Sequence, residues 1–474
     1  MDLYQSAVET AHQIRTRQVS PVEVTQAYLD RIDAVNDTIN AVVWRNDEEV
    51  LAAARRAEEA VMAGGELPAF HGVPIPVKNL ADVAGQPNNM NSLALDDEPR
   101  HQTDPAVARL QQAGFLLMGR TNSPEFGPLT VSENARYGAT RNPWDPQRTS
   151  GGSSGGASAA VAAGMAPLAH ASDGGGSIRV PSSCTGLVGL KPSRGRVPQS
   201  VVGWEHSTVE GVITRTVTDA AAVLDVMAGP DAQAWYSAPA PTRSYASSAG
   251  EPPSRLRIGL MLTAPTGMPV DSECVEAAQK AAAALAGAGH EIVDVSPVLF
   301  SRETIAAFQV IISSWVSANT VKDESLLDPY IRYRYEQGRS LSAGQYAQAS
   351  AMMQLETRQI VKQWGGDFDV LLTPTMATVT PPVGLVYDEA NNDPSGVRQT
   401  EIQMVSFTSF ANMTGQPAIS LPVHTASDGM PVGAQLVGAP FQDDVLLQLG
   451  AQLERSFRWD ERRAPEPAVT VSAR

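Results

Sequence analysis

The chain has 474 residues, of which 43% are hydrophobic, and its formal net charge at pH 7 is −16. A chain of this length can bury a sizeable core as one large enzyme or as several domains. The acidic balance argues against binding to nucleic acid or to an anionic membrane surface. The longest apolar stretch, around residues 157–169, is too short to span a bilayer, and we find no signal-peptide pattern at the N-terminus.

The two cysteines, Cys184 and Cys274, form no CxxC pair and have no histidine spacing that suits zinc. We therefore expect buried free thiols, a cytoplasmic location and no metal.

The N-terminal region, about residues 1–65, is predicted to form a helical layer. Ser20, Pro21 and Glu23 combine a helix N-cap, a first-turn proline and a capping-box glutamate. A second helix is predicted over 47–62 and ends at two glycines.

The segment 71–80, HGVPIPVKNL, is an apolar run around one lysine, Lys78. Burial disfavours a charged ammonium and lowers its pKa, so a buried lysine can act as a base. The alternative is a lysine at a strand end whose charged head reaches solvent.

Two Gly/Ser clusters follow at residues 150–156 and 173–177, after a helix and strand over 105–120 and a long loop. Between them we expect a helix buried on all sides over 155–164 and a short strand over 166–172. The glycines after Asp173 allow backbone N–H groups to converge on one point and hold an oxyanion. The apolar flanks disfavour a flexible linker, the other interpretation of such runs.

The second half alternates strands and helices, which indicates an α/β protein. We expect a strand over 186–192 in which Lys191 is structural, a surface connection over 229–254, a βαβ-like unit from 256 to 295, and helices over 300–362. A strand over 368–373, a hairpin formed by 418–423 and 432–437, and a last helix from Asp443 complete the chain.

The segment GGSSG matches the GxSxG pattern of α/β-hydrolases, with Ser153 as nucleophile and His424 or His290 as base. That pattern requires a strand directly before the serine, and NPWDPQRT at 142–149 is a poor strand. His170 is interpreted as a core histidine whose ring nitrogens have hydrogen-bond partners. A serine hydrolase without a histidine base needs another base, and lysine is suitable.

The motifs GGSSGG and DGGGSIRVP, with VPIPVKN upstream and GLVGLKPSRGR downstream, resemble the amidase signature family of serine hydrolases. The resemblance extends over nearly the whole chain, as far as NMTGQPAISLP at 412–422 and the last helix. It implies one amidase domain over 1–474, with a central mixed β-sheet covered by helices on both faces. Its signature core would span about 66–200, its helical pocket region about 255–362 and its C-terminal part about 363–474.

The resemblance also implies roles for individual residues. Ser177 would be the nucleophile, Ser153 the bridging serine after a cis peptide bond, and Lys78 the base. The backbone N–H groups of the turn would form the oxyanion hole, from Gly174, Gly175, Gly176 and Ser177. The supporting residues would be Ser154, Asp173 and Arg179.

No metal or organic cofactor is implied, and the expected partner is a small amide or carbamate substrate. Several details resemble the branch with 6-aminohexanoate cyclic-dimer hydrolases and metagenomic urethanases, including NSPEFG from Asn122 and the AISLPV and DGMPVG segments. Many relatives carry Thr, Ile or Asn at Gly174, so the oxyanion loop is expected to be less constrained here.

Two other functions within the same fold are considered: the A subunit of a tRNA-dependent amidotransferase, and a catalytically silent binding protein. We expect a monomer or homodimer. The predicted pocket wall includes Met90, Tyr137, Ile312 and Trp315.

Overall fold

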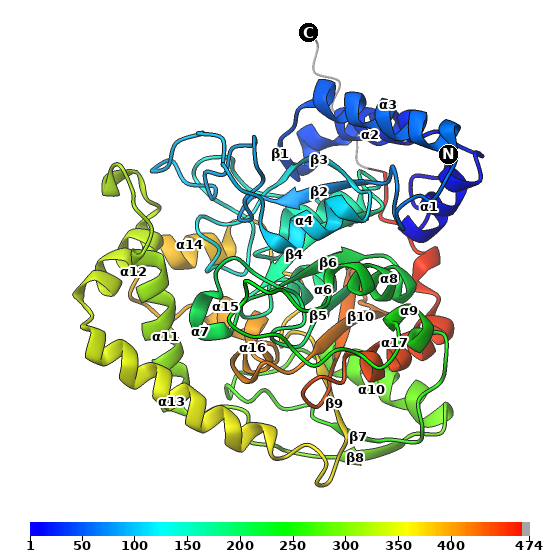
Figure 1. The fold of residues 1–474 in the computed structure, drawn as a ribbon. Coiled ribbons are helices and arrows are strands. Elements are labelled where there is room, and N and C mark those ends of the chain that lie inside the picture. The colour runs from blue at the N-terminus through cyan, green and yellow to red at the C-terminus, as the bar shows by residue number, and fades with distance from the viewer. Residues whose placement is uncertain (467–474) are drawn as a thin grey trace.

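Eight strands form one mixed sheet through the middle of the molecule (Figure 1) in the order β4-β6-β5-β10-β11-β9-β7-β8. The computed structural model describes residues 1–466. The first five neighbouring pairs in this order are antiparallel and the last two, β9 with β7 and β7 with β8, are parallel. The predicted mixed α/β architecture and the βαβ-like unit, β7-α10-β8, are thereby confirmed.

The strands are β1 (Val42–Trp44), β2 (Pro74–Lys78), β3 (Leu116–Thr121), β4 (Leu168–Asp173), β5 (Val188–Lys191), β6 (Val209–Thr214), β7 (Arg257–Leu260), β8 (Glu291–Asp294), β9 (Val370–Pro374), β10 (Ala418–Thr425) and β11 (Pro431–Val437). The helices of the N-terminal half are α1 (Ala7–Arg15), α2 (Pro21–Ile39), α3 (Asp47–Ala63), α4 (Pro105–Gln112), α5 (Gly155–Ala162), α6 (Arg179–Thr185), α7 (Gly203–His206) and α8 (Val217–Met227). The later ones are α9 (Tyr245–Ala249), α10 (Ser272–Gly287), α11 (Arg302–Ser317), η1 (Glu324–Leu326), α12 (Pro329–Ser340), α13 (Ala343–Val361), α14 (Leu385–Asn392), α15 (Gln399–Val405), α16 (Ser409–Thr414), α17 (Asp443–Phe457) and η2 (Trp459–Glu461).

Helices cover both faces of the large sheet. Successive residues of a strand point to opposite faces, and on β10 the Ile419 side chain lies near Gly450 of α17, whereas Ser420 lies near Ser183 of α6 around Gly433. Helix α10 packs beside α17, and α5 beside α6. Strands β10 and β11 are buried along almost their whole length because both of their faces are covered.

A smaller sheet, in the order β1-β3-β2, joins the large one through β2, which contacts β4. Lys78 is the last residue of β2 and is buried, as is every residue of that strand. The contact therefore brings Lys78 beside the C-terminal end of β4, where the second Gly/Ser cluster begins.

The N-terminal layer forms as its caps predict. The Ser20 side chain accepts from Glu23 N–H, and the Glu23 carboxylate accepts from Ser20 N–H, so the capping box at the start of α2 is confirmed. Helix α3 ends at Gly64, which has a φ of 76°.

Helices α11, α12 and α13 form a second layer at one side of the molecule (Figure 1), with α11 packed against both of the others. Their apolar side chains belong to a hydrophobic cluster separate from the main core. This layer, together with the loop at 127–130, borders the mainly apolar cavity described below.

The surface connection predicted over 229–254 is correct for its first part only. Residues 245–249 form α9, with Tyr245 only 2% exposed. Ser244 caps this helix, and α9 packs against α8 and α17, contacts that the Pro- and Ser-rich composition does not reveal. None of the helices within residues 1–466 combines the length and apolarity needed to cross a membrane.

Candidate active site

The turn between β4 and α6 is held by the side chain of Asp173. Its Oδ1 accepts from Gly176 N–H at 2.7 Å and its Oδ2 accepts from Ile178 N–H at 3.1 Å. Gly176 has a φ of 137°, and a Cβ there would lie 2.5 Å from Thr408 Oγ1, so only glycine fits. Because the Gly176 N–H donates to Asp173, it is turned into the loop, unlike its predicted place in an oxyanion hole.

Arg179 braces the same turn from α6. Its guanidinium donates to both Asp173 oxygens at 3.0 Å, and both side chains are fully buried. It also donates to the side chains of Gln435 and Asn412, at 2.7 and 2.6 Å. The adjacent guanidinium holds the pKa of Asp173 well below its usual range against the opposing effect of burial. Asp173 and Arg179 thus tie the turn to β11 and α16.

Lys78 reaches the first serine cluster. Its Nζ donates to Ser153 Oγ at 2.8 Å, and Ser172 on β4 accepts from the same ammonium or amine through its Oγ at 3.1 Å. The peptide bond before Ser153 is cis. Burial lowers the pKa of Lys78 to about 7, with the charges of Glu210 and Asp173 acting in the opposite direction. A group with this pKa is neutral in a large fraction of molecules near neutral pH.

The first serine cluster and the β4-α6 turn meet through Ser154. Its N–H donates to the Ser177 carbonyl oxygen at 3.2 Å, and its hydroxyl donates to the Ser172 carbonyl oxygen at 3.1 Å. Within residues 1–466 no hydrogen bond joins Ser153 to Ser177. Ser177 instead lines a cavity, together with Gly175 and Gly176 of its own turn.

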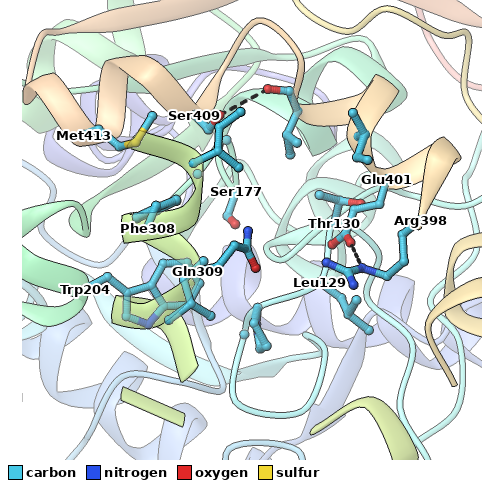
Figure 2. A pocket seen from close by; sticks show the side chains of 18 of the residues that line it. Leu129, Thr130, Ser177, Trp204, Phe308, Gln309, Arg398, Glu401, Ser409 and Met413 are labelled. Carbon is cyan, nitrogen blue, oxygen red and sulfur yellow. Dashed lines mark hydrogen bonds and ion pairs between the residues drawn. The ribbon is translucent and has the colours of Figure 1, made fainter. Parts of the chain in front are cut away.

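The cavity has a volume of about 290 Å³ and opens on Ser177 (Figure 2). Figure 2 shows Trp204, Phe308 and Met413 on one wall, and Phe300 and Ile312 also line the cavity. The opposite wall carries Leu129, Thr130 and the ion pair of Arg398 with Glu401. Such a cavity suits a small, largely apolar substrate with a few polar groups.

Trp204 explains why residue 174 is a glycine. A Cβ on Gly174 would lie 2.9 Å from Cε3 of the Trp204 indole. The indole also packs edge-on against Phe308, with ring centroids 6.1 Å apart. The sequence predicted a less constrained loop at Gly174, whereas the loop is packed against an aromatic side chain.

The predicted pocket wall is only partly brought together. Ile312 lines the cavity beside Ser177, but Met90, Tyr137 and Trp315 are not among its lining residues. Trp315 borders a different hollow with Val201, because the segment around Trp204 separates the two spaces. The Tyr137 hydroxyl accepts from Asn89, and Met90 packs in the second hydrophobic cluster.

Neither histidine proposed for the GxSxG alternative is available to Ser153. His424 has Glu273 and Lys280 at its two ring nitrogens, and His290 has Gln452 and the backbone of Leu256. No strand directly precedes Ser153 in the described chain. The nucleophile-elbow interpretation is therefore wrong. His170 is fully buried on β4, as predicted, with its Nε2 3.0 Å from Glu210. The expectation that its polar atoms are satisfied is wrong, because neither ring nitrogen makes a hydrogen bond within residues 1–466.

Several residues of the site carried no signal in the sequence. In the sequence Ser172 only ends a predicted strand, and Asn412 lies within the NMTGQPAISLP motif. Trp204, Arg398 and Glu401 have no motif around them, because each reaches the cavity from a segment far from the Gly/Ser clusters.

A family model, known sequences and solved structures each match most or nearly all of this chain. The Amidase family model matches residues 23–447. A 6-aminohexanoate-cyclic-dimer hydrolase from Paenarthrobacter ureafaciens is 36% identical, with 98% of this chain and 97% of the relative covered. The solved structure of a 6-aminohexanoate cyclic dimer hydrolase with substrate superimposes with a TM-score of 0.91 at 33% identity, covering 98% of this chain and all of that one. A bacterial aryl acylamidase structure gives a TM-score of 0.88 at 27% identity, covering 98% and 99% of the two chains.

Proposed function

Because the chain belongs to the amidase signature family of amide hydrolases, we propose that it cleaves amide and carbamate C–N bonds of small aryl and xenobiotic substrates. Lys78, Ser153 and Ser177 carry the reaction in this proposal. The observation that supports it most directly is the 2.8 Å hydrogen bond from buried Lys78 Nζ to Ser153 Oγ, next to a cavity that Ser177 lines.

The reaction begins with proton transfer. The neutral amine of Lys78 takes a proton from Ser153, which takes one from Ser177 as their hydroxyls meet, and the Ser177 oxygen attacks the substrate carbonyl carbon. The oxyanion is held by the backbone N–H groups of Gly174, Gly175 and Ser177, since that of Gly176 is engaged by Asp173.

Collapse of the tetrahedral intermediate breaks the C–N bond. The proton returns through Ser153 to the leaving nitrogen, and an acyl-Ser177 ester remains, which water hydrolyses. With an aryl carbamate the first product is the arylamine, and the alkoxycarbonyl ester on Ser177 is hydrolysed to an alkyl hydrogen carbonate, which decomposes to carbon dioxide and an alcohol. The aromatic wall formed by Trp204, Phe300 and Phe308 supports an aryl group in the substrate.

The test measures the hydrolysis of an acyl p-nitroanilide and of a matched alkyl N-(4-nitrophenyl)carbamate by variant proteins, since both substrates release p-nitroaniline. We expect Ser177→Ala and Lys78→Met to reduce kcat/KM by about 10²-fold or more, because each removes a group from the proton-transfer chain. Lys191→Met is the matched control: burial also lowers the pKa of Lys191 to about 7, but its Nζ donates to the Pro192 carbonyl oxygen.

Equal losses in Lys78→Met and Lys191→Met would contradict the assigned base. Release of p-nitroaniline from the anilide but not from the carbamate would restrict the function to amides. A glutaminase activity that exceeds both would favour the amidotransferase subunit instead.

A further inference from the structure

Gln309 extends from α11 into the cavity that Ser177 lines. Figure 2 shows its carboxamide between the aromatic wall and the Arg398 side, with the nitrogen end turned toward Ser177. Gln309 takes no part in the proposed proton transfers or in holding the oxyanion.

The orientation of the carboxamide is fixed by Arg334 of α12, which donates through Nη2 to Gln309 Oε1. A guanidinium has donors only, so the atom that it contacts must be the amide oxygen, and Nε2 must point away from it. Arg334 is itself held: it is 8% exposed and donates to the Tyr330 hydroxyl at 2.9 Å and to Ser313 Oγ at 3.2 Å.

Two other polar side chains of the cavity have partners: Arg398 donates to Glu401 through Nε, and the Ser409 hydroxyl donates to the Val405 carbonyl oxygen. In the described part of the chain, the Ser177 hydroxyl and the Nη groups of Arg398 make no hydrogen bond. Within residues 1–466 no side chain or backbone oxygen accepts from Gln309 Nε2. It is therefore a pre-oriented donor that faces the substrate space from a wall made mostly of carbon.

We propose that Gln309 determines substrate preference by donating a hydrogen bond from Nε2 to a second carbonyl oxygen of the substrate, on the acyl side of the scissile bond. A substrate that fills the cavity removes water from Nε2. A substrate without an oxygen at this position leaves Nε2 buried without a hydrogen bond. The free-energy cost of that unpaired donor would make the substrate with the second carbonyl bind more tightly. The substrate class is thus a small amide or carbamate with a second, neutral carbonyl group. This inference rests on the proposed function only in placing the scissile bond at Ser177.

The test uses pairs of acyl p-nitroanilides that differ by one ketone oxygen: 3-oxobutanoyl against butanoyl, 4-oxopentanoyl against pentanoyl, and 5-oxohexanoyl against hexanoyl. Binding is measured by calorimetry in a Ser177→Ala background, so that it needs no turnover. We expect at least one ketone to bind about three- to tenfold more tightly than its saturated partner. Adding Gln309→Met or Gln309→Glu should bring that ratio close to one.

Gln309→Glu keeps an oxygen for Arg334 and replaces the donor by a charged carboxylate oxygen of similar size, whereas Gln309→Met removes both polar atoms without adding a charge. The same loss in both variants therefore separates loss of the donor from loss of packing and from the added charge. Ser409→Ala, which alters another polar group of the cavity, should leave the ketone ratio as it is. The inference is overturned when no pair is discriminated, when no ligand binds, or when the ratio survives both Gln309 substitutions. The same pairs assayed for p-nitroaniline release with Ser177 intact report on the proposed function separately, because binding can discriminate even where no product forms.

Discussion

Two fully buried lysines, Lys78 and Lys191, have similarly lowered pKa values but different hydrogen-bond partners. Burial removes each ammonium group from water, and this is the main reason why the pKa of each lysine is lowered to about 7. Their neighbours differ: Lys78 donates to the hydroxyls of Ser153 and Ser172, whereas Lys191 donates to the Pro192 carbonyl oxygen. Only Lys78 therefore has a hydroxyl from which it can take a proton.

This difference predicts the pH dependence of the reaction. We expect kcat/KM for a p-nitroanilide to rise with pH through about 7 and to level off above it, since only the neutral amine of Lys78 accepts a proton. The measurement is a kcat/KM profile from pH 5.5 to 9 for the unaltered protein, Lys78→Met and Lys191→Met. Lys191→Met should keep the inflection and the residual activity of Lys78→Met should lack it. A flat profile between pH 6 and 8 in the unaltered protein would be inconsistent with this base.

At the scale of elements, the short helix α7 positions the aromatic wall of the cavity. Trp204 and Glu205 both have left-handed φ values, 51° and 50°. Glu205 accepts from the Tyr346 and Ser350 hydroxyls of α13, at 2.7 and 2.5 Å, and this anchor holds the strained segment in place. Trp204 is thereby packed against the β4-α6 turn at Gly174.

We expect Gly174→Ala to lower kcat/KM by roughly tenfold or more, because its Cβ would enter the Trp204 ring and displace either the turn or the wall. Gly174→Ala combined with Trp204→Leu should recover part of that loss, since the smaller side chain removes the collision. The measurement is a double-mutant cycle on p-nitroanilide hydrolysis. Gly287→Ala is the control, as nothing lies within 4 Å of a Cβ placed there and this residue of α10 does not line the cavity. Strictly additive effects of the Gly174 and Trp204 substitutions would contradict the contact.

Elements that begin or end at a recognisable sequence pattern could be predicted, and those that depend on tertiary contacts could not. The capping box at Ser20 predicts the start of α2, and the Gly/Ser clusters predict the bounds of α5 and β4. Helix α6 was missed because RVPSSCT is short and polar, and its burial comes from contacts with β5, β10 and β11. Ile312 and Trp315 share a helical stripe, but the stripe does not reveal that α7 lies between the spaces that they line.

At the scale of the whole molecule, the formal charge of −16 counts every carboxyl group as ionised, whereas some buried ones keep a proton near neutral pH. Burial raises the pKa of Glu125 to about 8 and that of Glu133 to about 7. Glu125 links the loop after β3 to the start of α12, because its carboxyl group accepts from Ser92 Oγ and, at 2.8 Å, from Asp328 N–H. Both hydrogen bonds favour the ionised carboxylate, so the raised pKa of Glu125 comes from burial and from the nearby charge of Asp328.

We expect the unfolding free energy to fall as the pH rises from about 5 to 7. The native state keeps the proton on Glu125 in this range, whereas the unfolded chain has lost it. Lys78 and Lys191 do not obscure the effect, because their lowered pKa values change the stability only above about pH 7, where they act in the opposite direction.

Glu125→Gln isolates this contribution, since its amide oxygen can accept from Asp328 N–H while its NH₂ group donates to Ser92. The substitution should change stability little at pH 5 and raise the unfolding free energy by about 1–3 kcal/mol at pH 8. Urea unfolding at pH 5, 6, 7 and 8 measures the difference, with Glu59→Gln on the exposed side of α3 as the control. A Glu125→Gln difference that stays constant over this range would mean that Glu125 is ionised in the native state throughout.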